Sequence, residues 1–229
     1  GLAAAGMVPF CNIYSTFMQR AYDNVIHDVA IQDLPVVMCL DRGGIVGEDG
    51  VTHHGVFDMA AFGAVPGLTI AAPMDELELR NMMYTGLQYG HPFMIRYPRG
   101  NGAGRLWRGV PFEALPVGRG RRLREGTDVA LVTVGTVGNA AARAAERAAA
   151  KGVSVAHYDL RFAKPLDEAL LAGVGAEFRH VVTVEDGSLR GGVGEAVTAF
   201  FNARGCEVAV HSLGIGDEWV EHGTPAQLY

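Results

Sequence analysis

The chain has 229 residues, of which 49% are hydrophobic and 19% are charged, and its formal net charge is −6. This composition is typical of a globular protein with one large core or two smaller ones, and the negative charge disfavours a nucleic acid or an anionic membrane as partner. No apolar run approaches the ~20 residues of a membrane-spanning helix, no secretory signal is recognisable, and the three cysteines are widely spaced, which together predict a cytoplasmic protein without a cysteine metal site.

Apolar runs alternate with helical patterns along the first hundred residues. Strands are predicted at 8–13, 36–40, 68–72 and 93–97, and helices over 16–32, from 57 onward and from 73–75 to about 89. Residues 98–126 then change in composition, with three prolines, seven glycines and a run of arginines. We place a linker at 101–126 and interpret the arginines at 119, 121, 122 and 124 as a solvated linker run.

The alternation of strands and helices resumes beyond the linker. Strands are predicted at 129–134, 153–158, 181–184 and 208–213, and helices at 139–151, 167–172 and 194–204. The pattern predicts an α/β fold with two domains, 1–100 and 127–229, each a mainly parallel sheet flanked by helices. Residues 1–6 resemble the end of a helix and 224–229 the start of one, so we expect a piece of a longer chain in which both domains are incomplete at the ends.

A glycine-rich loop follows the second predicted strand and carries charged side chains. It spans residues 41–55, with glycines at 43, 44, 47, 50 and 55 that allow the backbone to approach a ligand closely. Arg42 offers a fork for phosphate or carboxylate, and the Asp49 carboxylate near the His53 imidazole would hold its tautomer and raise its basicity. A solvated loop with a structural bond between His53 and Asp49 is the alternative, and the role of His54 stays open. The density of glycines favours the functional interpretation.

A second candidate is the stretch from Tyr14 to Arg20, at a predicted turn from strand to helix. Free backbone N–H groups at such a turn attract anions, and Phe17 could stack on a flat heteroaromatic ring. On this motif alone, the more ordinary interpretation is favoured, in which Phe17 packs in the core and Arg20 pairs with a carboxylate.

A third candidate is Arg99, which follows the last strand of the first predicted domain. That strand end delivers Arg99 to the same edge of the sheet as Arg42, and two converging arginines suit a substrate phosphate. Salt bridges between domain and linker are an equal alternative. The turn Gly191–Gly194 precedes a helix but lacks the spacing of a phosphate loop, so we interpret it as close packing of strand against helix.

Together, these segments resemble the 1-deoxy-D-xylulose-5-phosphate synthases, a family of thiamine-diphosphate enzymes in the transketolase superfamily. The similar stretches are 14–23, 27–32, 41–55, 96–101 and 159–167. The resemblance covers essentially the whole chain. It implies a transketolase pyrimidine-binding (central) domain at 1–100 and a transketolase C-terminal domain at 127–229.

The resemblance implies a transferase reaction in which pyruvate condenses with glyceraldehyde 3-phosphate with loss of CO₂. This reaction opens the methylerythritol phosphate route of isoprenoid (isoprene) biosynthesis and also feeds thiamine and pyridoxal biosynthesis. The cofactors implied are thiamine diphosphate and Mg²⁺, and the assembly implied is a cytoplasmic homodimer.

Roles for single residues follow from the same resemblance. Phe17 would stack on the aminopyrimidine ring of the cofactor, and Arg20 would brace the cofactor pocket. His53 and Asp49 would be the catalytic residues that position and protonate groups near the thiazolium carbon. The residues implied to bind substrate, through the aldehyde phosphate or the oxygens of the intermediate, are Tyr14, Arg42, Arg99 and His53.

Two parts of the family pattern are missing. The glutamate that protonates the aminopyrimidine is expected just upstream of Gly1, and the diphosphate-binding domain with its Mg²⁺ ligands is also absent. We therefore expect no metal ligands in this chain and no activity from it alone. Two enzyme alternatives stay open, the β-subunit of a 2-oxo acid dehydrogenase and the C-terminal half of a split transketolase. The non-enzyme alternative is an α/β module for dimerisation or regulation.

Overall fold

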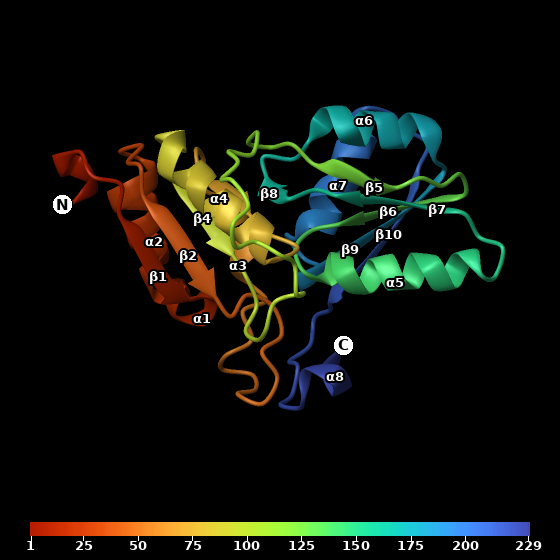
Figure 1. The fold of residues 1–229 in the computed structure, drawn as a ribbon, viewed down its shortest axis with the longest axis horizontal. Helices are drawn as coiled ribbons and strands as arrows, with labels where there is room; N and C mark the ends of the chain where they lie inside the picture. Colours follow the sequence, from red (N-terminus) through yellow and green to blue (C-terminus); the bar gives the residue numbers. More distant parts are fainter.

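The first half of the chain builds a mainly parallel sheet whose strands are short apolar runs. The computed structural model describes all residues from 1 to 229 and orders this sheet β1-β2-β4-β3-β8. Its parallel strands are β1 (Phe10–Tyr14), β2 (Val37–Asp41), β3 (Thr69–Ala71) and β4 (Phe93–Arg96). Tyr14 is paired with Asp41 in register, so the ends of β1 and β2 deliver their next residues to one edge of the sheet (Figure 1).

The helix predicted over 16–32 is not continuous, which corrects the sequence-based expectation. It begins with α1 (Ser15–Met18), passes through a 3₁₀ turn (Gln19–Ala21) and α2 (Tyr22–Asn24), and ends in a π-helical turn (Val25–Ala30). Ser15 does not cap it, because the Ser15 hydroxyl donates to the Asp58 carboxylate at 3.0 Å instead.

The other helices of the first half are α3 (Asp58–Gly63) and α4 (Glu76–Tyr89), with a 3₁₀ turn at Ala3–Ala5. Asp75 caps α4, since its side chain accepts the backbone N–H of Glu78 at 2.8 Å.

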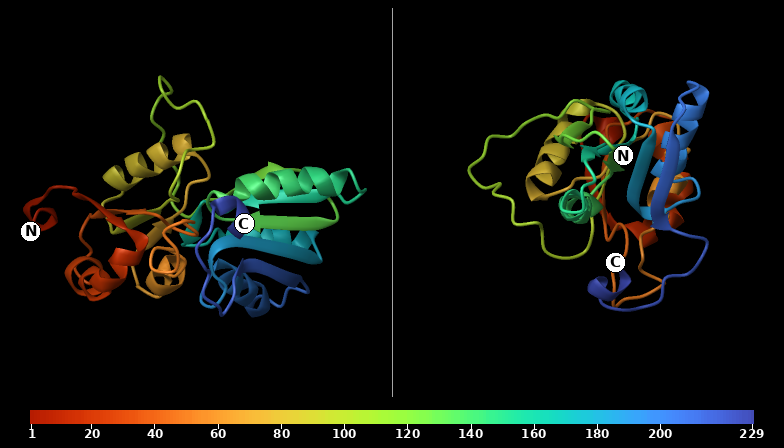
Figure 2. Two further views of the ribbon diagram at one scale, coloured as in Figure 1. Left: turned by 90° about the horizontal axis from the view of Figure 1, so that it is seen from below. Right: turned by 90° about the vertical axis from the view of Figure 1, so that its right-hand side faces the viewer.

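The second half forms a sheet ordered β10-β9-β6-β7-β5. Its strands are β5 (Arg121–Arg124), β6 (Val129–Thr133), β7 (Val155–Asp159), β9 (His180–Ser188) and β10 (Ala209–Ile215). Its helices are α5 (Val137–Ala149), α6 (Glu168–Glu177), α7 (Val193–Ala203) and the short α8 (Pro225–Leu228). Alanines of α5 pack on one face of the sheet, while α6 and α7 cover the other (Figure 2).

The predicted fold class is confirmed: each half is a parallel-dominated sheet flanked by helices. The domain division at 100 and 126 stays a prediction. One strand from the second half of the chain belongs to the first sheet. The three-residue strand β8 (Phe162–Lys164) follows β7 in the chain but pairs antiparallel with β3 of the first sheet. None of the helices is both long enough and apolar enough to span a membrane.

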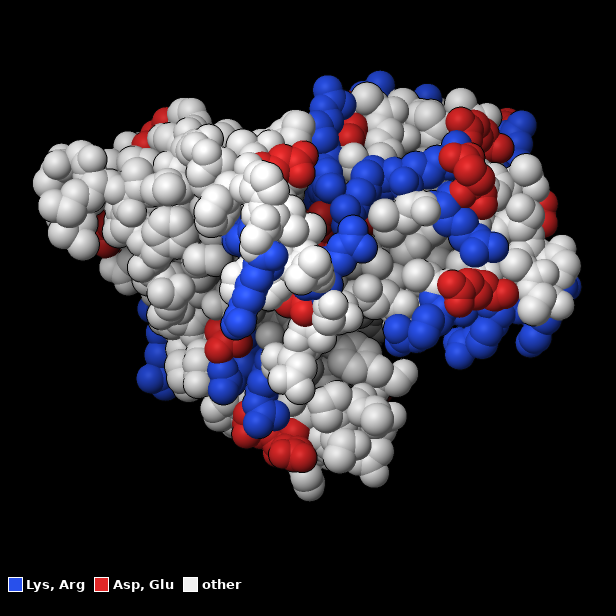
Figure 3. Space-filling view, in the orientation of Figure 1, with Lys and Arg blue, Asp and Glu red and all other residues white.

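The arginine run at 119–124 is not a solvated linker, which is a second correction. Residues 121–124 form β5, antiparallel to β7, and basic side chains gather over this part of the molecule (Figure 3). The Arg121 guanidinium lies 2.9 Å from the Asp159 carboxylate and 3.0 Å from the Glu78 carboxylate of α4. Both carboxylates are buried and need a cation, so Arg121 joins the two halves.

Candidate functional site

Three aromatic rings come together at the edge where β1 and β2 end. Tyr14 closes β1, Phe17 lies in the first turn after it, and their ring centroids are 5.1 Å apart with an angle of 15° between planes. The His53 and Phe17 ring centroids are 5.7 Å apart in a T-shaped arrangement, with 69° between the planes. Phe17 is 49% exposed, so it is not a core residue. Phe17 thus keeps exposed aromatic surface of the kind on which a flat ring stacks.

Arg42 is held in an unusual backbone conformation beside this platform. Its φ is +61°, a value that costs a residue with a side chain on the order of 1–3 kcal/mol and that concentrates at functional sites. The Asp41 carboxylate accepts the Arg42 backbone N–H at 2.7 Å and also pairs with its guanidinium. The same guanidinium lies 3.8 Å above the Tyr14 ring. Two neighbours therefore fix Arg42, and its Nε still has no hydrogen-bond partner.

Asp49 and His53 do not pair with each other, contrary to the sequence-based expectation. The Asp49 carboxylate lies 3.8 Å from Nε of Arg99, and His53 Nδ1 lies 2.9 Å from the Thr52 hydroxyl. The hydroxyl one residue away saturates Nδ1, so Nε2 is the ring nitrogen left for a ligand. Arg99 pairs with the loop rather than with the linker, and exposed Arg20 lies one helical turn after Phe17 without an ion pair.

His54, whose role the sequence left open, is a structural residue. Its ring is buried, and the backbone N–H of Val46 donates to Nδ1 at 3.1 Å. Nε2 therefore carries the proton of the neutral ring, which suits the Glu221 carbonyl oxygen at 3.3 Å.

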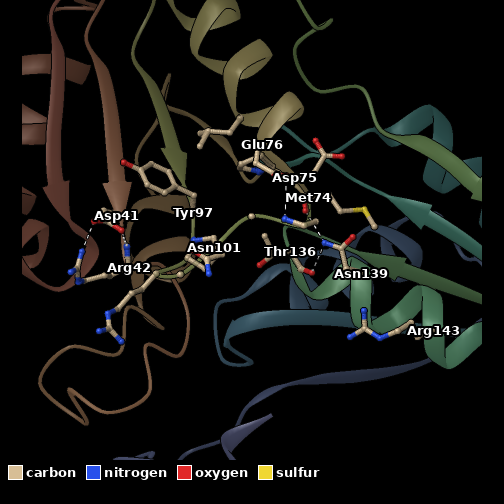
Figure 4. A pocket seen from close by; sticks show the side chains of 17 residues that line it. Asp41, Arg42, Met74, Asp75, Glu76, Tyr97, Asn101, Thr136, Asn139 and Arg143 are labelled. Atoms are coloured by element: carbon tan, nitrogen blue, oxygen red, sulfur yellow. Dashed lines mark hydrogen bonds and ion pairs between the residues drawn. The ribbon is translucent and has the colours of Figure 1, made fainter. Parts of the chain in front are cut away.

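A cavity of about 840 Å³ opens beside Arg42 and Arg99, between the two halves. Figure 4 shows that its walls come from the ends of β2 and β4, the start of α4 and the start of α5. The residues that α5 and the turn before it contribute are Thr136, Asn139 and Arg143. The acidic lining is already engaged, since Asp41 pairs with Arg42 and Glu76 accepts the backbone N–H groups of Ala103 and Gly104. Of the three arginines in the lining, Arg42 and Arg99 share their charge with Asp41 and Asp49, and Arg143 has no carboxylate partner, so the cavity keeps cationic groups that suit an anion.

A buried ionic cluster below the loop was missed in the sequence. Arg96, at the end of β4, is 3% exposed and lies between the carboxylates of Asp58 (3.1 Å from Arg96 Nε) and Asp186. Its Nη2 donates to the Gly55 carbonyl oxygen at 3.2 Å. An arginine within an otherwise apolar predicted strand was the available signal, because a buried cation needs partners.

The turn at Gly191–Gly194 agrees with the packing interpretation. The Glu185 carboxylate accepts the backbone N–H groups of Val193 (3.0 Å) and Gly194 (2.8 Å) at the start of α7. A Cβ at Gly192 would lie 2.2 Å from the Ser188 carbonyl oxygen, so no side chain fits there. Burial raises the pKa of Glu185, and the two N–H groups partly oppose that effect.

One end of thiamine diphosphate, its flat aminopyrimidine ring, has a counterpart among these side chains. The exposed part of the Phe17 ring suits the aminopyrimidine ring. No cluster of three or more His, Cys, Asp or Glu side chains is arranged to hold a metal ion.

Comparison with known proteins gives two family matches and a set of close relatives. Residues 1–104 match the transketolase pyrimidine binding domain, and residues 118–229 match the transketolase C-terminal domain. The 1-deoxy-D-xylulose-5-phosphate synthases of Bacteroides fragilis and Bacteroides thetaiotaomicron are 58% and 57% identical to the chain over its whole length. Each match covers 36% of the relative, so the chain spans about a third of the length of these synthases.

A solved structure shares the architecture. It is a split-gene transketolase, described as an inactive β4 tetramer, with a TM-score of 0.84 and 26% sequence identity. The match covers 94% of the present chain and 69% of that one.

Proposed function

Because the chain belongs to the transketolase superfamily, we propose that it is the C-terminal portion of a 1-deoxy-D-xylulose-5-phosphate synthase. The whole enzyme would condense pyruvate with glyceraldehyde 3-phosphate and release CO₂. The identity of 58% to a synthase over the full chain carries this choice over a split transketolase, to which the identity is 26%.

The cofactor, when bound, supplies the electron sink for decarboxylation and carboligation. Phe17 would hold its pyrimidine ring. Arg20, in the 3₁₀ turn that follows α1, would line the cofactor pocket on the same side as Phe17. The remainder of the polypeptide would supply the glutamate, the Mg²⁺ ligands and the diphosphate site. The chain alone is then inactive, and the working form is a cytoplasmic homodimer.

The acceptor aldehyde would bind where part-buried Arg42 and exposed Arg99 meet the cavity. Arg42 and Arg99 would bind its phosphate through charge-assisted hydrogen bonds, with Tyr14 below Arg42 and Asp49 beside Arg99 to orient them. As the new carbon–carbon bond forms, the carbonyl oxygen of the aldehyde takes a proton. His53 would hold that proton at Nε2, since Nδ1 is engaged by Thr52.

A chimera tests the proposal directly. The chain is joined to the N-terminal remainder of the Bacteroides fragilis synthase, and the product from pyruvate, glyceraldehyde 3-phosphate, Mg²⁺ and thiamine diphosphate is identified by mass spectrometry. Deoxyxylulose phosphate from the chimera, and none from the chain alone, is the expected result. Transfer between ketose phosphates would favour a split transketolase, acetylation of lipoamide a dehydrogenase subunit, and no turnover by a folded, cofactor-loaded sample a non-catalytic module.

A further inference from the structure

The loop that carries Arg42, Asp49 and His53 has little regular structure of its own. Its strand-like pairing is confined to isolated bridges of Gly43 and Gly44 with Gly55, and its other internal backbone hydrogen bonds close short turns at Gly47–Gly50 and Gly50–His54. Gly44, Gly47 and Gly50 have positive φ, which glycine adopts readily. No helix or strand holds these residues in that conformation. The geometry of such a segment depends on what surrounds it.

The C-terminal half supplies two of those surroundings. Below the loop, Asp186 at the end of β9 pairs with Arg96, which in turn binds the Gly55 carbonyl oxygen at 3.2 Å. Gly44 lies so close to Asp186 that a Cβ would be 2.2 Å from its Oδ2. The buried Asp186 carboxylate therefore packs against Gly44 directly and reaches Gly55 through Arg96.

Above the loop runs the end of the chain. The Tyr229 hydroxyl accepts the Ile45 backbone N–H at 3.3 Å and donates to Asp186 Oδ2 at 3.4 Å. Pro225 leaves no room for a side chain at Gly47, and the Gly223 N–H donates to the Gly47 carbonyl oxygen at 3.4 Å. The loop is thus enclosed between the C-terminal sheet and the final turn of the chain.

We propose that Asp186 and Tyr229 are positioning residues for the acceptor, which act on Arg42 and His53 through Arg96 and the loop backbone. Through these contacts the C-terminal half influences the positions of the side chains that would bind the acceptor. The inference rests on the proposed function for its kinetic part. Because the phosphate is bound both before and during the reaction, a misplaced Arg42 raises KM for the aldehyde more than it lowers kcat.

The test compares two variants of the chimera with matched controls. Asp186→Asn keeps the shape of the side chain and removes its charge, and Asp159→Asn does the same to a buried, arginine-paired aspartate away from the loop. Tyr229→Phe removes one hydroxyl from the loop contact, and Tyr84→Phe removes a hydroxyl from α4, where the ring packs on Phe112.

Two readouts are taken: KM and kcat for both substrates, and amide hydrogen exchange of residues 43–47. We expect KM for the aldehyde to rise about 10-fold in Asp186→Asn and about 3-fold in Tyr229→Phe, with KM for pyruvate within twofold of the unaltered chimera. Exchange at 43–47 should be faster in both, while the two controls match the unaltered chimera in KM and in loop exchange.

The inference is overturned if Asp186→Asn and Tyr229→Phe match their controls both in KM for the aldehyde and in amide hydrogen exchange of residues 43–47, whatever their thermal stability. Asp186→Asn that does not fold leaves the decision to Tyr229→Phe. A chimera without synthase activity would refute the proposed function alone, since hydrogen exchange still reports whether the two residues hold the loop.

Discussion

Arg121→Met should destabilise the protein far more than Arg122→Met, although the two arginines are neighbours on one strand. Their side chains are almost equally exposed, 32% and 31%. Arg121 pairs with the buried carboxylates of Glu78 and Asp159, whereas Arg122 pairs with Glu125, which is 82% exposed. Arg122 also lies 3.6 Å from half-exposed Glu177 and 5.3 Å over the Tyr158 ring, so the two substitutions remove the same group and differ chiefly in the burial of the carboxylates they leave behind.

The expected sizes follow from that difference. Removing one partner of a buried ion pair costs about 3–5 kcal/mol, and the partial exposure of Arg121 brings the expected loss to about 2–3 kcal/mol. An exposed pair is worth about 0–1 kcal/mol, which bounds the effect of Arg122→Met. Arg161 still pairs with Glu78 at 2.8 Å, so Asp159 is the group left without a cation.

The loss in Arg121→Met should depend on pH. Burial first, and Glu78 second, raise the pKa of Asp159 to about 6, and Arg121 lowers it. Without Arg121 the native pKa rises further above the unfolded value of about 3.9, so the native state binds the extra proton below that raised pKa. Stability therefore falls as the pH rises through this window, and the deficit should be larger at pH 8 than at pH 5.

Urea unfolding of both variants at pH 5 and pH 8 measures these quantities. Equal losses in Arg121→Met and Arg122→Met, or a deficit that grows on acidification, would refute the reasoning about the buried carboxylates.

Three further predictions concern the pH dependence, the site and the cofactor. Burial and, second, the charge of Arg121 lower the pKa of His157 to about 4, so His157 stays neutral in the native state while the unfolded chain takes a proton near pH 6.5. The neutral His157 ring contributes about 3 kcal/mol at most to the free energy of unfolding above that pH, and this contribution is lost as the pH falls to 4. In urea unfolding across this range, the free energy of unfolding of His157→Gln should therefore change less with pH than that of the unaltered chain. In the chimera, His53→Ala and Arg99→Ala should each lower kcat/KM by about 10²-fold, and normal turnover in both would remove them from the site. The chain alone should bind thiamine diphosphate weakly or not at all, because it offers a ring platform without a metal anchor, and calorimetry that finds tight binding would contradict this.

The central strands β2 and β4 were predictable because they are buried on both faces. Runs such as Val37–Leu40 and Phe93–Ile95 are continuously apolar, and the structure places β2 and β4 there within a residue or two. β8 was missed because three residues carry no periodicity, and only its pairing with β3 defines it. The break in the helix after Met18 was missed because apolar spacing does not distinguish α from 3₁₀ or π turns.

The site divides in the same way. Tyr14 and Asp41 end neighbouring parallel strands, so the strand-end rule brings Tyr14, Phe17 and Arg42 to one edge. Partners within the loop do not follow from any such rule. His53 bonds to Thr52 and Asp49 to Arg99 because loop backbone, rather than spacing, decides which groups meet. The cluster of Arg96 with Asp186 joins residues 90 positions apart, and no local pattern predicts it.

The first sheet cannot be completed until β8 has been synthesised. The first sheet ends within its own half at β3, whose free edge can accept any extended strand. Residues 162–164 occupy that edge, and they leave the ribosome only after the linker, β5, β6, α5 and β7 have been made. At roughly 5–20 residues per second, the nascent first half is exposed for several seconds with an unprotected edge. A nascent-chain complex stalled before residue 162 should therefore bind chaperones or pair with other chains more readily than one stalled beyond β8.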